Sequence, residues 1–175
     1  GKVSLSGEQR LRAAIKAVEM GTDIERVCKF LTWTEFEDIA LLAFRTNDFV
    51  VRKHLRFSWA ERRWEIDILA LKEPVAASVD CKQWHRGWSG SASTKAAELQ
   101  IQRTQALSEA STSIKEKLVM RGWKRAYFVP IVLSLTVGAP RFIRDVPIVP
   151  VLQLRSFLQE MPAYIGSLTR FRVDF

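Results

Sequence analysis

Cysteine and histidine are scarce in this 175-residue chain, which has two of each. Cys28 and Cys81 are too few for a disulfide framework or a four-thiolate zinc site. Both lie in apolar patterns, so we expect them to be core residues in a reducing, cytoplasmic protein. With only His54 and His85, a histidine-rich metal site is not expected.

Long apolar runs are also missing. None approaches the roughly 20 residues that a membrane-spanning helix needs. The longest, Tyr127 to Leu135, contains Pro130 and predicts a buried strand. The first residues show no signal-peptide core, so neither export nor a membrane partner is expected.

Acidic residues are outnumbered: 19 Asp and Glu face 27 Lys and Arg, which gives a formal net charge of +8. Such a surplus favours a polyanionic partner, because neutralising phosphates releases their condensed counterions. We therefore expect nucleic acid as the partner, ahead of a membrane surface. Hydrophobic residues make up 47% of the chain, enough for a packed core in one domain with a small appendage.

The first 33 residues predict a helical N-terminal segment, 1–33. Residues 6–19 have helical apolar spacing and end before Gly21, and Thr22 or Asp23 then caps a shorter helix. Two helices joined at Gly21 could form a helix-turn-helix that reads DNA, or could simply brace a core. The sequence leaves both interpretations open.

The remaining residues, 34–175, predict one domain. It begins with a helix whose first turn reads as a capping box, with Thr34 and Glu37 in reciprocal positions. An extended segment starts at Phe49, and later elements are expected over residues 93–120 (helix), 125–135 (strand), 146–152 (strand) and 154–159 (helix). This mixture predicts an α/β fold, with a central mixed sheet flanked by helices.

Residues 63–83 alternate between apolar and polar side chains and predict an antiparallel hairpin. A symmetric turn at Glu73–Pro74 would place Asp67 opposite Asp80 and Glu65 opposite Lys82, all on one face. The other face would carry four residues into the core: Ile66, Ile68, Val79 and Cys81.

The polar face of this hairpin suggests a metal site. Directly opposed side chains have Cβ atoms about 4.5–5.5 Å apart, so Asp67 and Asp80 would repel each other. A divalent cation removes that penalty, and carboxylate oxygens suit Mg²⁺ or Mn²⁺. The alternative is a solvated face, with an ordinary Glu65–Lys82 ion pair and two exposed aspartates.

The order of these residues resembles a known signature. Asp67, twelve intervening residues and then Asp80-Cys81-Lys82 look like the motif of the PD-(D/E)XK nuclease superfamily. The upstream helix with Phe36-Glu37 is similar to its Holliday-junction resolvase and methyl-directed restriction endonuclease branches. The match covers residues 34–105.

Two positions depart from that pattern: Ile66 replaces the proline, and Asp80 stands where glutamate is more usual. The resemblance implies a restriction-endonuclease-like fold. It also implies an endonuclease that hydrolyses DNA phosphodiester bonds with Mg²⁺ or Mn²⁺, of junction, repair or restriction type.

Residue roles follow from the resemblance. Asp67 and Asp80 would hold the metal with the backbone carbonyl of Cys81, and Glu37 would add a ligand unless it serves only as a helix cap. Lys82 would orient the attacking water or stabilise charge in the transition state. Gln102, on the next helix, would approach the site or belong to a water-facing polar stripe.

DNA contacts are expected on both sides of the hairpin. Trp84, Arg86 and Trp88 could grip a backbone or stack on an unpaired base, or fold their rings onto the core. His85 is a further candidate for a base. Basic residues in nearby sequence could contact phosphates: Arg52, Lys53, Arg56, Arg62 and Arg63.

Two rival functions use the same fold: a DNA-binding or scaffold protein without catalysis, and an RNA-processing nuclease. An enzyme that cuts both strands of a duplex would need two active sites, which a homodimer would supply.

Overall fold

The computed structural model describes residues 5–22, 26–27, 30–82, 90–135 and 141–175. Its helices are α1 (Gly7–Glu19), α3 (Trp33–Arg45), α4 (Gly90–Ala110), α5 (Lys115–Leu118) and α6 (Leu154–Tyr164), with short 3₁₀ turns η1 (Val151–Gln153) and η2 (Ile165–Ser167). Its strands are β1 (Val50–Trp59), β2 (Arg62–Lys72), β3 (Val75–Lys82), β4 (Arg125–Ser134), β5 (Phe142–Ile143), β6 (Val146–Pro150) and β7 (Phe171–Asp174).

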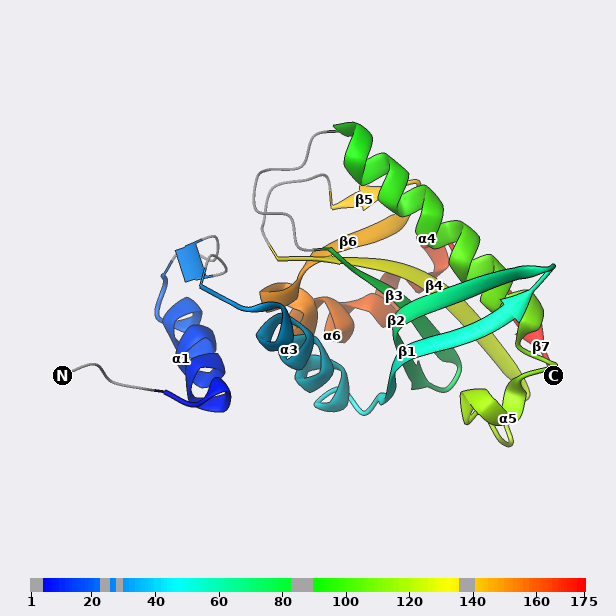
Figure 1. Cartoon of the computed structure of the whole chain (residues 1–175), viewed down its shortest axis with the longest axis horizontal. Coiled ribbons are helices and arrows are strands. Elements are labelled where there is room, and N and C mark those ends of the chain that lie inside the picture. The colour runs from blue at the N-terminus through cyan, green and yellow to red at the C-terminus, as the bar shows by residue number, and fades with distance from the viewer. Residues whose placement is uncertain (1–4, 23–25, 28–29, 83–89, 136–140) are drawn as a thin grey trace.

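Within these residues the strands form one mixed, seven-stranded sheet, in the order β1-β2-β3-β4-β6-β5, with β7 also on β4. The β3–β4 and β4–β6 pairs are parallel, and the others are antiparallel. Helix α4 packs on one face, while α3 and α6 lie side by side on the other (Figure 1). The predicted α/β fold with a central mixed sheet flanked by helices is confirmed.

The β2–β3 hairpin has the predicted register. Lys72 pairs with Val75 at the turn, and the pairing continues without a slip to Ile68 and Val79. Asp67 and Asp80 are the next residues along the two strands, so they lie where the backbone pairing ends.

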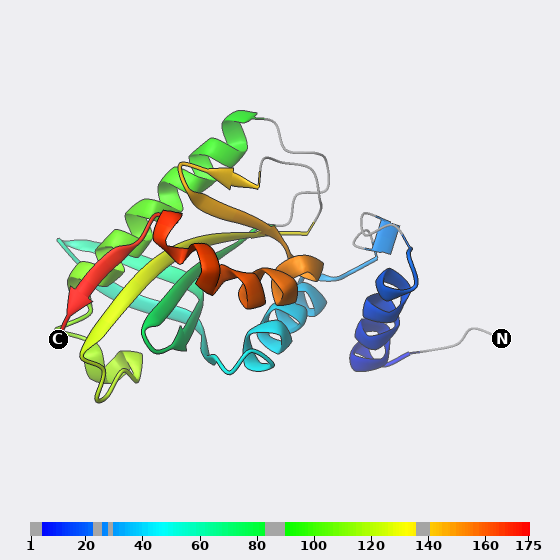
Figure 2. The same ribbon diagram turned by 180° about the vertical axis from the view of Figure 1, so that it is seen from behind.

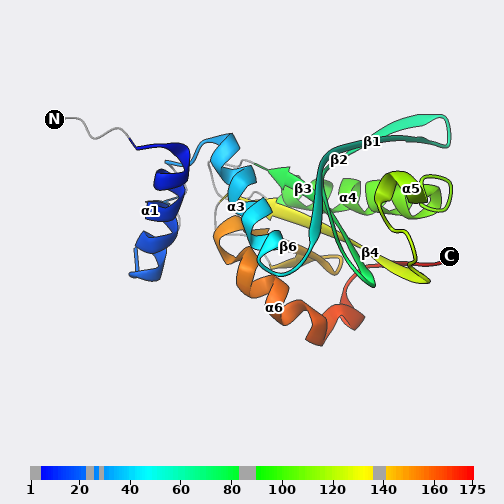
Figure 3. The ribbon, with the colours of Figure 1, turned by 90° about the horizontal axis from the view of Figure 1, so that it is seen from below.

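The β1–β2 hairpin bends beside Asp67. Its pairing skips His54 and Asp67, and His54 has a φ of 50°, in the left-handed region. Beyond this point the faces exchange: Ile66 packs on the α4 side, whereas Ile68 packs under α3. The prediction that Ile66 shares a core face with Ile68 is therefore wrong, and Figure 3 shows the hairpin turning sharply part-way along.

Helix α3 begins earlier than predicted. Its N-cap is Thr32, whose hydroxyl accepts from the backbone of Glu35, while the Glu35 carboxylate accepts from the backbone of Thr32 at 2.8 Å. The predicted Thr34–Glu37 capping box is wrong, because the same spacing is satisfied two residues upstream. Glu37 is therefore not the helix cap.

The predicted helix over residues 93–120 is interrupted. Helix α4 ends at Ala110, and only the short α5 follows. The hydroxyls of Ser111 and Ser113 donate to carbonyls three residues earlier, Ser108 and Ala110, at 2.6 and 2.7 Å. Serine side chains that compete for backbone groups in this way favour turns over a helix interior.

Strand β4 lies in the middle of the sheet and is almost wholly buried, as its apolar run predicts. Pro130 does not disrupt the pairing of β4 on the side away from β3. Residues 125–128 pair with β7 and residues 132–134 pair with β6, so the proline falls in the gap between them.

Helix α1 stands apart from the sheet (Figure 2). Arg10 ties it to the start of α3, with Nε 2.8 Å from Oε1 of Glu35. The predicted second helix falls mostly on residues 23–25 and 28–29, outside the described residues. In the part of the chain that is described, no helix has the length and apolar character needed to span a bilayer.

Candidate active site

The open end of the β2–β3 hairpin brings the predicted acids together. Past Ile68 and Val79 a side chain joins the two strands: Oδ2 of Asp67 accepts from the backbone nitrogen of Cys81 at 2.8 Å. The hydrogen bond fixes the Asp67 carboxylate against β3, next to Asp80.

Asp80 is a buried acid held by two cations. Its residue is 3% exposed, and Nζ of Lys82 lies 3.1 Å from Oδ1 and 2.9 Å from Oδ2. Nη1 of Arg103, on α4, lies 2.6 Å from Oδ1. Oδ2 is buried and accepts no well-aligned hydrogen bond from the described residues. This oxygen is therefore only partly satisfied.

The pKa of Asp67 depends on its burial and on the charges around it. Burial raises the pKa of its carboxyl, and the nearby charge of Asp80 raises it further. The Cys81 N–H and the cations of Lys82 and Arg103 oppose that increase in pKa, without cancelling it. The charge of Asp80 thus disfavours ionisation of Asp67.

Glu37 lies close to this group but has its own partner. It is 6% exposed, and its Oε2 is 2.7 Å from Nζ of Lys53, while Nε2 of His54 is 3.9 Å from Oε1. Burial raises the pKa of the Cys81 thiol well above its usual value, and the charges of Asp67, Asp80 and Glu37 add to the increase. Glu37 therefore lies within electrostatic reach of Cys81, with its charge compensated by Lys53.

Glu65 does not lie opposite Lys82 as predicted, and the Glu65–Lys82 ion pair of the alternative interpretation is not formed. Glu65 lies beyond the bend in β2 and pairs with β1 instead: its Oε2 is 3.0 Å from Nε of Arg56, and its Oε1 is 3.6 Å from Nδ1 of His54. Lys82 turns to Asp80. The exchange of faces at the bend explains why these two side chains miss each other.

Helix α4 contributes different residues from the predicted one. Gln102 is exposed. Gln100 is fully buried, and its Nε2 donates to the carbonyl and hydroxyl of Ser78 at 2.7 and 3.1 Å. Gln100 and Arg103 are three residues apart on the face toward β3, a phase that the buried Ala96 and Ala97 could have indicated.

The predicted DNA-contacting residues are spread over several environments. Arg62 stacks over the ring of Trp64, 4.1 Å from its centre, and Arg63 is exposed near the tip of the β1–β2 hairpin. Lys53 forms an ion pair with Glu37. The aromatic and basic loop lies outside the described residues: Trp84, His85, Arg86 and Trp88.

The donor set fits Mg²⁺ or Mn²⁺ in its chemistry, since these ions bind one or two carboxylates and complete their shells with water. The buried, partly satisfied Oδ2 of Asp80 is an oxygen that such an ion would use. Among the residues that the structure describes, no three acid, histidine or cysteine side chains gather as a ready-made metal site.

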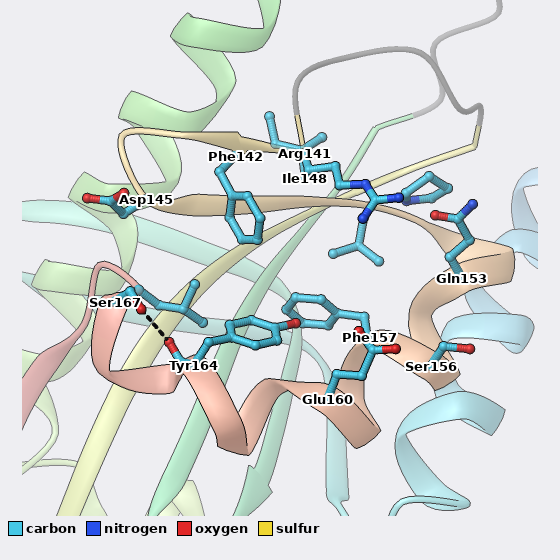
Figure 4. A pocket seen from close by; sticks show the side chains of 13 residues that line it. Arg141, Phe142, Asp145, Ile148, Gln153, Ser156, Phe157, Glu160, Tyr164 and Ser167 are labelled. Carbon is cyan, nitrogen blue, oxygen red and sulfur yellow. Dashed lines mark hydrogen bonds between the residues drawn. The ribbon is translucent and has the colours of Figure 1, made fainter.

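A separate cavity of about 650 Å³ lies between the β5–β6 hairpin and α6 (Figure 4). Phe142, Phe157 and Tyr164 project into it, and none of the predicted site residues is part of its described lining. Burial raises the pKa of the Tyr164 hydroxyl, with a further increase from Glu160. The ring of Tyr164 packs edge to face on Phe142 and Phe157, and polar side chains such as Arg141, Asp145 and Glu160 complete a mixed lining.

No family model and no curated protein matches the chain. Among solved structures, it is similar to the crystal structure of AF1548, a protein of unknown function, with 14% identity and a TM-score of 0.39. The similarity covers 59% of this chain and 48% of that protein, so the chain spans about half its length. A likeness at this level supports no inference about function.

Proposed function

We infer that this chain is a divalent-metal-dependent endonuclease that hydrolyses DNA phosphodiester bonds on a restriction-endonuclease-like fold. The observation that carries the proposal is the Asp67–Asp80 pair at the open end of the hairpin, with Lys82 on the same strand. A fold gains nothing from two adjacent acids, one of them buried, and it tolerates the repulsion where a site needs both.

Asp67 and Asp80 would hold the metal, and the carbonyl of Cys81 remains a predicted third ligand. A bound ion would polarise the phosphate and lower the pKa of its water. Lys82 Nζ, now on Asp80, is positioned to donate to a phosphate oxygen or to the attacking water. Glu37, paired with Lys53, would orient water at the edge of the site.

The surroundings suit such a substrate. The chain carries a net charge of +8, and Arg62 and Arg63 lie near the tip of the β1–β2 hairpin. Arginine and lysine contacts of this kind position a nucleic acid through its phosphates. A DNA substrate and the unpaired, buried thiol of Cys81 both agree with a cytoplasmic location.

A cleavage assay tests the proposal. Labelled single-stranded, duplex, flapped and four-way-junction DNA, and matched RNA, would be incubated with Mg²⁺, Mn²⁺ or EDTA. We expect metal-dependent DNA cleavage that Asp80→Ala slows by on the order of 10³-fold, and the preferred substrate would identify the branch. Cleavage of RNA alone would assign the RNA-processing alternative.

One observation favours a second function, a DNA-binding protein without catalysis. Lys82 and Arg103 together compensate the charge of Asp80 without any metal. Tight DNA binding with no cleavage under any metal condition would establish this second function and overturn the first.

A further inference from the structure

Arg103 is the closest partner of Asp80. Its Nη1 lies 2.6 Å from Oδ1, against 3.1 Å for Nζ of Lys82 to the same oxygen. Arg103 reaches down from α4, whereas Lys82 lies two residues along β3. Asp80, the acid that would hold a metal, is therefore paired with Arg103 from helix α4, which packs on the sheet.

A guanidinium keeps its charge at any physiological pH, so Arg103 cannot leave Oδ1 by losing a proton. A divalent cation must therefore compete with its full charge for Oδ1. A divalent ion and a guanidinium on one carboxylate also repel each other strongly in a site of low exposure. Occupation of Oδ1 by one of them disfavours the other.

The ion pair is not the only attachment of α4 to the sheet among the described residues. Gln100, one turn earlier, is fully buried and bonds to Ser78 on β3. The Arg103 side chain is 30% exposed, so it has room to swing toward solvent. Lys82 would still compensate Asp80 after Arg103 leaves.

We propose that Arg103 is the resident counter-ion of Asp80 and exchanges with the divalent cation, so that it sets the metal concentration at which the site loads. The inference rests on the proposed function, because it takes Asp80 as a metal ligand. Arg103 is in this sense a positioning residue, which controls when the Asp80 oxygens become available.

The test is a calorimetric titration of the full chain with Mn²⁺ in the absence of DNA. Arg103→Met removes the charge and keeps much of the side-chain length. We expect it to bind Mn²⁺ at least roughly tenfold more tightly, since a cation within contact distance changes the affinity of a carboxylate by this order. Arg103→Lys should stay close to the original chain.

Arg144→Met is the matched control. It removes another arginine that pairs with an acid on α4, since Nη2 of Arg144 lies 2.7 Å from Oε1 of Glu98. Its Mn²⁺ affinity should not change. In cleavage assays the Mn²⁺ concentration for half-maximal rate should fall for Arg103→Met alone.

Unchanged Mn²⁺ affinity in Arg103→Met, with binding lost in Asp80→Ala, would overturn the inference and leave the proposed function standing. Absence of both Mn²⁺ binding and cleavage in every variant and in the original chain would overturn both. Arg103→Gln serves as a second neutral variant. Loss of fold in both neutral variants, seen by circular dichroism, would make Arg103 structural and end the exchange proposal.

Discussion

The first turn of α3 and the open end of the β2–β3 hairpin each bury an acid against an arginine. Glu35 is 6% exposed with Arg10 at 2.8 Å, and Asp80 is 3% exposed with Arg103 at 2.6 Å. Around Glu35 every neighbour favours the charge: bonds from Thr32 and the charge of Arg10 lower the pKa of this carboxyl despite its burial.

Around Asp80 the neighbours conflict. A second acid, Asp67, stands beside it with a raised pKa, and one oxygen of Asp80 lacks an aligned hydrogen bond. The contrast separates two uses of buried charge. The capping box stabilises its helix, whereas the acid pair keeps a repulsion that Lys82 and Arg103 offset only in part.

The most direct test of this contrast is to remove Asp80 or Glu35 and to measure the cleavage rate of each variant. Asp80→Ala should reduce the cleavage rate by on the order of 10³-fold, because it removes a metal ligand. Glu35→Ala should leave the rate of the folded protein unchanged. Equal losses in both variants, with circular dichroism spectra intact, would show that the two acids are not functionally distinct.

The lysine of the acid pair should have the next largest effect. Lys82→Ala should slow cleavage by roughly 10²-fold, the size seen when one donor to a developing charge is removed. Single-turnover kinetics at saturating DNA would isolate the chemical step. A rise in KM alone, with kcat unchanged, would instead assign Lys82 to binding.

The free energy of unfolding should depend more on Glu35 than on the acid pair, the reverse of the order for cleavage. Glu35→Gln should lower the free energy of unfolding by about 1–2 kcal/mol, since it weakens a cap and a buried ion pair. Because the folded pKa of Glu35 is lowered, its contribution is complete above the unfolded value of about 4.3 and is lost as the pH falls through the folded value.

Urea unfolding at several pH values would measure this contribution. The gap between the original chain and Glu35→Gln should be widest near neutral pH and should close in acid. A difference in unfolding free energy that does not change with pH would mean that the charge of Glu35 does not contribute to the cap.

The smallest expected effect is a gain in stability. Asp67→Asn should raise stability in EDTA by about 0.5–2 kcal/mol, a range common for stabilising single substitutions, because it relieves repulsion with Asp80. The folded pKa of Asp67 is raised, so its ionisation costs stability above that pKa and the cost vanishes below the unfolded value. The gain should therefore shrink as the pH falls, and thermal unfolding would show whether it does.

The sequence was sufficient for the features that depend on alternation and turn symmetry. The register of Ile68 with Val79 follows from a tight turn at Glu73–Pro74, and a one-residue slip would have turned buried side chains to the opposite face. The buried strand β4 and the helix α1 were predicted for the same reason, since strong local periodicity determines them.

What the sequence could not supply depends on contacts between distant segments. The bend at His54 lies on β1, so nothing in β2 alone announces that Glu65 and Ile66 change faces. Arg103 was missed because a helix with small residues on its buried side shows little apolar contrast. The short strands β5 and β7 have four residues or fewer and gain their pairing from β6 and β4.

On the side away from β3, Pro130 divides β4 into two halves that pair with different strands, and this has a consequence for amide hydrogen exchange. Residues 125–128 are protected by antiparallel β7, and residues 132–134 by parallel β6, with a residue that has no amide hydrogen between them. Local opening free energies follow such pairing units. The amides of β4 that face away from β3 should therefore exchange as two groups, one protected by β7 and one by β6, while β3 pairs with both halves.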